Sequence, residues 1–237
     1  MKEVLKLIET KKRQFSQLAL FKYMQDTSID PRQRLAWAPC FAPVAMPFTD
    51  LLRNDFRREP ANCELQEIIN KHTYEDETHY IWFLDDLKRL GFNESQSFTD
   101  NLQFFWGSET EKTRQVCYRI SHLIYKADPV TILAVIESIE ATGHVIFSHS
   151  TPAAMELQKI TKQPYVYFGQ HHLSRETGHT MGTESIENLL DNLQITETQK
   201  IDAFNAVEQV FKVVTDCVNE LLMYAQNHPV KQLIRLS

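Results

Sequence analysis

Residues 63–91 read CELQEIINKHTYEDETHYIWFLDDLKRLG, and this stretch decides the fold class. Apolar residues and three ionisable ones recur at steps of three or four: Leu65, Ile68, Ile69, His72, Asp76, His79, Phe83 and Leu87. That spacing is typical of an amphipathic helix, and Gly91 supplies a stop signal. The stretch therefore predicts one long helix that carries several metal-ligating residue types on a single face.

The composition favours an all-α protein. The chain has 237 residues, of which 43% are hydrophobic and 24% charged, and it contains only six glycines. Few glycines argue against a fold rich in strands and turns, and the length suffices for a substantial core. We expect one helical domain over residues 1–237, a bundle of seven or more helices. The net charge of −6 and the scattered basic residues make a nucleic-acid partner improbable.

The cysteines and the N-terminus indicate a cytoplasmic protein. Cys40, Cys63, Cys117 and Cys217 form no CxxC pair, and a chain of this size does not need disulfides. Charged residues are spread through the first fifteen positions, which therefore do not resemble the apolar core of a signal peptide. We also expect no segment of the chain to be apolar over the ~20 residues that a membrane span needs. We therefore expect reduced thiols, a cytoplasmic location and no membrane partner.

Further helices are expected along the rest of the chain. Four prolines should kink or interrupt the helical segment 31–47. Thr151 before Pro152 resembles a helix N-cap, and Thr196 with Gln199 resembles a capping box. The expected ranges are 2–26, 98–106, 109–126, a helix from Pro129, 151–161, 165–181 and 196–225.

The strongest functional signal is a motif that occurs twice. A histidine, an acid and a second histidine stand at positions i, i+4 and i+7 in two stretches: His72, Asp76 and His79, and then His172, Glu176 and His179. On a helix these positions lie within about 60° of one another, so each set can point at one target. Helix-borne carboxylates and histidines build metal sites in bundles. The alternative is that both sets are polar faces of ordinary helices.

A third helix should contribute a carboxylate. Glu140 lies in an apolar stretch, where an ionised carboxylate is costly unless it is paired or bound to a cation. Glu137 is the competing choice, and His144 could add a ligand. Glu75 could be a ligand, a hydrogen-bond partner of a ligand or a surface charge. A mixed sphere of imidazole and carboxylate suits divalent iron or manganese better than structural zinc.

The chain resembles the haem-oxygenase-like superfamily over most of its length. The residues that carry the resemblance are RLAWAP at 34–39, HTYEDETHYIWFLDDLKRLG at 72–91, ESIEATG at 137–143 and HHLSRETGH at 171–179. The superfamily includes TenA/THI-4 proteins, PQQ-synthase-like proteins and non-haem di-iron oxidases, also described as iron-containing redox enzymes. The resemblance implies a haem-oxygenase-like helical bundle. A homodimer would fit this fold, although no sequence feature demands it.

The resemblance is nearest to the di-iron branch. In that branch the late helix supplies a His, acid, His set, an earlier helix supplies a Glu, and the first ligand helix supplies a carboxylate and a His. The matching residues here are His172, Glu176, His179, Glu140 and His79. His72 stands where related proteins often have Glu, so Asp76 or Glu75 would substitute, and one or two metal ions would bind.

The function implied is an iron-dependent oxidase or oxygenase acting on a small organic substrate with O2, in which Glu140 and Glu176 are catalytic. The first alternative is a TenA-like enzyme of thiamin salvage or a cofactor-free oxidase of the quinone-synthase type. The thiaminase-type reaction needs an activated cysteine in the helix that here holds Glu140, where there is none, and Cys117 lies one helix earlier. The second alternative is a binding protein of the same fold.

Overall fold

In the computed structural model the described residues, 1–176 and 184–230, form helices and no strand, which confirms the all-α class. Side chains are described for residues 1–175 and 188–230. The helices before residue 100 are α1 Lys2–Phe15, α2 Ala19–Gln25, α3 Pro31–Arg34, α4 Ala38–Ala45, α5 Phe48–Leu51, the π-helix η1 Leu52–Phe56, α6 Glu64–Asp76, α7 His79–Arg89 and α8 Phe98–Trp106. The later ones are the 3-10 helix η2 Ser108–Thr110, α9 Glu111–Ile124, α10 Pro129–Thr161, α11 Gln170–Glu176, α12 Glu184–Asn192 and α13 Glu197–Asn227.

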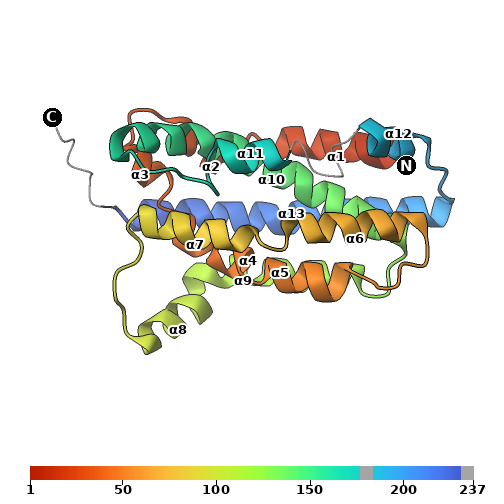
Figure 1. Ribbon diagram of the computed structural model, residues 1–237, viewed down its shortest axis with the longest axis horizontal. Coiled ribbons are helices and arrows are strands. Elements are labelled where there is room, and N and C mark those ends of the chain that lie inside the picture. Colours follow the sequence, from red (N-terminus) through yellow and green to blue (C-terminus); the bar gives the residue numbers. More distant parts are fainter. Residues whose placement is uncertain (177–183, 231–237) are drawn as a thin grey trace.

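Two long helices form the centre of the bundle. α10 and α13 pack against each other along most of the length of the molecule, and α1 and α9 flank them (Figure 1). The N-terminus of α10 is capped by Asp128, whose carboxylate accepts a hydrogen bond from the Val130 amide at 2.9 Å. The expected capping box of Thr196 and Gln199 begins α13, so this sequence prediction is confirmed. α10 is buried on several sides and is largely apolar, whereas α13 is amphipathic and buries one apolar face.

The expected helix 2–26 is interrupted, and the expected second start at Thr151 is wrong. α1 ends at Phe15, and Leu18 is extended before α2 begins. α10 instead continues through Pro152 to Thr161, and Thr151 is a buried interior residue. Packing of Ala153, Ala154 and Leu157 in the core outweighs the backbone hydrogen bond that proline removes. The interrupted proline-rich segment after residue 31 is found as predicted.

Among the described residues, two segments reach the length and apolarity of a membrane span, which corrects the expectation that none would. They are Pro31–Phe56 and Pro129–Thr161. In the most apolar 18 residues of each segment, 56% of the first and 67% of the second are buried within the fold. The first is broken into short helices, and the second is the central core helix α10. Core burial accounts for their apolar character.

The expected continuous helix 63–90 is broken at Glu77 and Thr78. The Thr49 hydroxyl donates a hydrogen bond to the Glu77 carbonyl at 2.9 Å. The Ile81 amide, which in a continuous helix would donate to that carbonyl, donates to the Thr78 carbonyl at 3.1 Å. The carboxylate of Glu77 is bound by Arg57 at 2.6 Å and by Arg53 at 3.1 Å. These tertiary contacts end α6 and start α7 at His79, so α6 and α7 follow one another along one side of the bundle (Figure 1).

Candidate metal centre

Two histidines from distant parts of the chain lie in contact. His79 begins α7 and His172 lies in α11, and Nε2 of His172 is 3.1 Å from Nδ1 of His79. Both residues are buried, with exposed fractions of 8% and 2%. His172, the one residue of the second motif whose side chain is described, therefore meets His79 of the first motif inside the bundle.

The orientation of the His172 ring is fixed by the backbone. Its Nδ1 lies 2.9 Å from the Tyr167 carbonyl oxygen. A carbonyl can only accept, so Nδ1 carries the proton and, in the neutral ring, the lone pair of Nε2 faces His79. Metal-binding histidines are commonly held in this way, with the second nitrogen donating to a carbonyl or carboxylate. The rings of Phe147 and Tyr167 pack on His172 with centroid distances of 4.0 and 4.7 Å.

A second group of ligating atoms joins α6 to α10. His72 Nε2 lies 3.2 Å from Asp76 Oδ2 and 3.3 Å from Glu140 Oε1. One ligating atom from each of these three residues lies within 4.8 Å of the other two. Of the two candidate glutamates on α10, Glu140 is the one in this group.

Asp76 connects the two groups. Its Oδ2 faces His72, while its Oδ1 lies 3.8 Å from Nδ1 of His79. The carboxylate is buried, with an exposed fraction of 4%. A carboxylate whose two oxygens face two different sets of ligands is able to bridge two cations.

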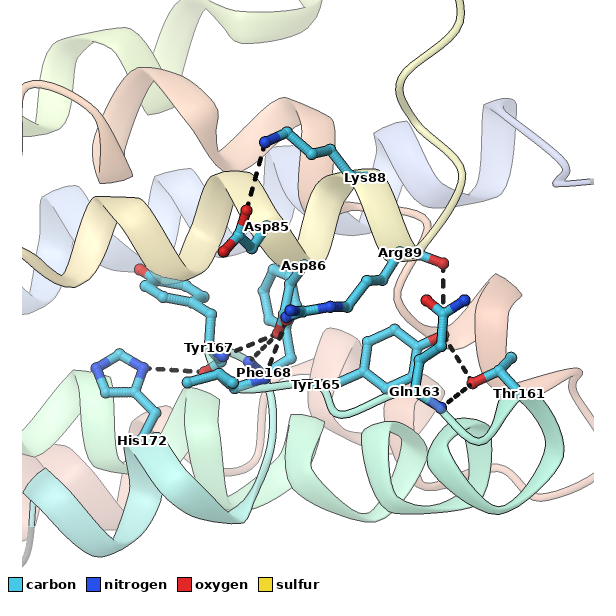
Figure 2. Close-up of polar contacts among 11 residues, drawn as sticks. Asp85, Asp86, Lys88, Arg89, Thr161, Gln163, Tyr165, Tyr167, Phe168 and His172 are labelled. Atoms are coloured by element: carbon cyan, nitrogen blue, oxygen red, sulfur yellow. Dashed lines mark hydrogen bonds and ion pairs between the residues drawn. The ribbon is translucent and has the colours of Figure 1, made fainter.

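The loop before His172 is held by a buried carboxylate. Asp86 of α7 accepts hydrogen bonds from the consecutive amides of Val166, Tyr167 and Phe168 at 2.9, 2.8 and 3.1 Å (Figure 2). Arg89 lies 3.2 Å from the same carboxylate. Burial raises the pKa of Asp86 despite these donors. This carboxylate fixes the backbone whose Tyr167 carbonyl orients His172.

These contacts explain why the expected helix 165–181 begins later. Residues 166–169 bend so that three amides can converge on Asp86, and α11 begins only at Gln170. A Cβ at Gly169 would collide with the Tyr165 carbonyl oxygen, so the bend requires glycine there. Sequence reasoning missed Asp86. It lies seven residues after His79, on the same helix face, and that spacing is the signal that could have found it.

An apolar cavity of about 110 Å³ opens beside the ligating atoms. Its lining includes Asp76, His79, Glu140 and His172, whose ligating atoms lie close together and form its polar end. Tyr80 and Tyr167 also line the cavity, and the other lining residues are largely apolar. Some aromatic residues near the motifs thus line the cavity, whereas Tyr74 is half exposed and lies against Arg57.

The remaining candidates lie as follows. Glu75 and Glu137 are half-buried on α6 and α10, and His144 is half-buried one turn after Glu140. Glu176 is the last residue of α11, and its side chain lies outside the part of the chain described. His179 lies outside the described residues.

The buried cysteines do not have the character of nucleophiles. All four cysteines are free, as expected. Burial raises the pKa of Cys117 to about 12 and raises that of Cys217, which lines the cavity, well above its usual value. A catalytic cysteine needs a lowered pKa or an adjacent base. The thiaminase-type alternative is therefore disfavoured.

In comparisons with known proteins, no family model matches the chain and no curated protein matches it. The functional argument consequently depends on the geometry of the site.

Proposed function

We propose that this protein is a haem-oxygenase-like non-haem iron enzyme, an oxidase or oxygenase that uses O2 on a small organic substrate. Manganese is the alternative metal. The ligands would be His72, Asp76, Glu140, His79 and His172, and the motif match adds Glu176 and His179.

The observation that carries the proposal is the separation of His79 and His172. Two nitrogens that bind one ion at about 2.0–2.1 Å each lie roughly 3.0–3.4 Å apart. The two facing nitrogens are 3.1 Å apart. His72 lies 3.2 and 3.3 Å from the oxygens of Asp76 and Glu140, which is again the spacing of neighbouring ligands. Each set needs only small shifts to hold an ion.

The chemical nature of the donors favours iron or manganese over structural zinc. Imidazole and carboxylate dominate the site, and Cys217 is the only cysteine among the described residues that line the cavity. Thiolate-rich sets are typical of structural zinc, whereas mixed histidine and carboxylate sets are typical of iron that reacts with O2. The shared carboxylate of Asp76 favours two ions over one.

The surrounding residues have roles that do not depend on the number of ions. The bound metal would supply the activation of O2, which side chains alone do not provide. The backbone carbonyl of Tyr167 keeps the proton on Nδ1 of His172, so the lone pair of Nε2 faces His79 and could bind a metal ion there. The largely apolar walls would limit the access of water to the reacting centre.

The test is metal loading with matched histidine variants. The protein would be reconstituted with ferrous iron without oxygen, freed of excess metal and analysed for iron, and O2 uptake would then be followed. His172→Ala should lose most of the iron. His171→Ala is the control, because the adjacent His171 is exposed and packs edge-on against Trp82. Wild-type protein that retains less than about 0.2 iron or manganese per chain would refute the proposal.

A further inference from the structure

The cavity has a distinct chemical character. Its described lining includes no Lys or Arg, although two carboxylates, Asp76 and Glu140, lie at the polar end. An anionic group that entered would therefore meet negative charge unless a cation bound there first. The opposite walls, which include Phe41, Ile120 and Val214, favour an apolar group.

The cavity is also small. Its volume of about 110 Å³ is below that of an engineered 150 Å³ protein cavity that binds benzene. Small side-chain movements would admit a group of this size, whereas a long chain or a fused ring system would require repacking of the bundle. The dimensions thus select compact groups.

Within the described part of the chain, no contact requires position 143 to be glycine. It lies in the interior of α10, where glycine costs about 0.5–1 kcal/mol relative to alanine. Of the side chains that the structure describes, a Cβ added at this position would meet only Phe147, at 3.7 Å, which is ordinary van der Waals contact. No neighbouring element with described side chains is close enough to require glycine. The missing methyl group instead leaves space in the cavity, one turn from Glu140.

We propose that the site accepts a substrate with a compact, uncharged apolar group, about the size of a benzene ring, and that Gly143 sets the size limit. Naming this group as part of a substrate rests on the proposed function. An anionic group on the same molecule would be bound by the metal at the polar end. The uncharged apolar group would bind in the cavity whether or not the metal is present.

The experiment uses benzene as the neutral probe, benzoate as the anionic probe and naphthalene as the oversized probe. Binding of each would be measured by calorimetry on the full chain, both metal-free and loaded with ferrous iron. Benzene should bind in both states, and naphthalene should bind at least about tenfold more weakly. Benzoate should bind at least about tenfold more tightly to the iron-loaded protein than to the metal-free protein.

Gly143→Ala separates this role from a structural one. The variant should unfold at a higher temperature, because alanine favours the helix, yet bind benzene at least about tenfold more weakly. Ser148→Ala is the matched control, since Ser148 is half-buried on the same helix and outside the cavity lining. It should leave benzene binding unchanged.

Equal benzene binding by Gly143→Ala and wild type, or no benzene binding by wild type, would overturn the inference even if iron loads fully. If iron does not load but benzene binds and Gly143→Ala weakens it, the proposed function fails and the apolar site with its size limit stands.

Discussion

The backbone of Tyr167 connects Asp86 to the candidate ligand His172. The Tyr167 amide donates to Asp86 at 2.8 Å, and the Tyr167 carbonyl accepts from Nδ1 of His172 at 2.9 Å (Figure 2). Because Asp86 is wholly buried and binds three consecutive amides, it holds this peptide in one orientation. The position of a metal ligand on α11 thus depends on a carboxylate of α7.

Replacing Asp86 should therefore weaken both the fold and the site. Asp86→Ala leaves three amides and the partly exposed Arg89 without their acceptor, and each buried donor that loses its partner costs about 1–3 kcal/mol. Iron affinity should fall by about 10–100-fold, the usual effect of removing a group that orients a ligand. Urea unfolding would measure the loss of stability, and titration with ferrous iron would measure the loss of iron affinity.

Two further variants make this test decisive. Asp86→Asn keeps the shape and one acceptor oxygen, so it should fold and show the loss of iron affinity. Asp85→Ala removes a neighbouring carboxylate that only contacts Lys88 at the surface, and its free energy of unfolding should change by less than about 0.5 kcal/mol. Unchanged iron affinity in Asp86→Asn and Asp86→Ala would show that the loop does not position His172.

The raised pKa of Asp86 predicts a specific pH dependence. In the unfolded chain this carboxyl should titrate near its ordinary value of about 3.9. Because burial raises its pKa in the fold, the folded state holds the proton more strongly, and the contribution of Asp86 to stability falls as pH rises through the interval between the two values. The stability advantage of wild type over Asp86→Asn should therefore shrink from about pH 3 to pH 7. An advantage that grows over this range would contradict the raised pKa.

The sequence predicted the helical class and the approach of His172 to His79 from patterns of residue spacing along the chain. Helical spacing identifies which residues share a face, and caps such as Thr196 with Gln199 mark where a helix begins. His79 and His172 each lie on the buried face of a helix. Because buried helix faces in one bundle pack against each other, such residues tend to lie near one another. The presence of Glu140 near His72 follows in the same way from the apolar surroundings of that glutamate.

The breaks could not be predicted, because distant residues cause them. The interruption at Glu77 depends on Thr49, which lies 28 residues earlier, and the late start of α11 depends on Asp86, which lies some 80 residues earlier. Pro152 stays within α10 because of core packing that the local sequence does not report. Tertiary contacts thus overrode local propensity at these positions.

The break between α6 and α7 should depend on the Thr49 hydroxyl. Thr49→Val keeps the side-chain shape but removes the donor to the Glu77 carbonyl, and it should lower the free energy of unfolding by about 0.5–1.5 kcal/mol. Iron affinity should also fall, because His79 begins the helix that follows this break. Thr10→Val is the control, since that hydroxyl bonds within an exposed helix turn. Equal stability and iron affinity in both variants would show that Thr49 does not determine the break.

The reactivity of the thiols separates an iron enzyme from a cysteine-dependent one. Cys63 is exposed, whereas burial raises the pKa values of Cys40, Cys117 and Cys217, so native protein should present one rapidly reacting thiol to an aromatic disulfide reagent. Cys63→Ala should abolish that fast phase, and denaturant should expose the remaining three. Because no cysteine is proposed to react, Cys117→Ala should retain iron-dependent O2 uptake in proportion to its folded fraction. A fast-reacting thiol that persists in Cys63→Ala would identify an activated cysteine and favour the thiol-dependent alternative over the metal centre.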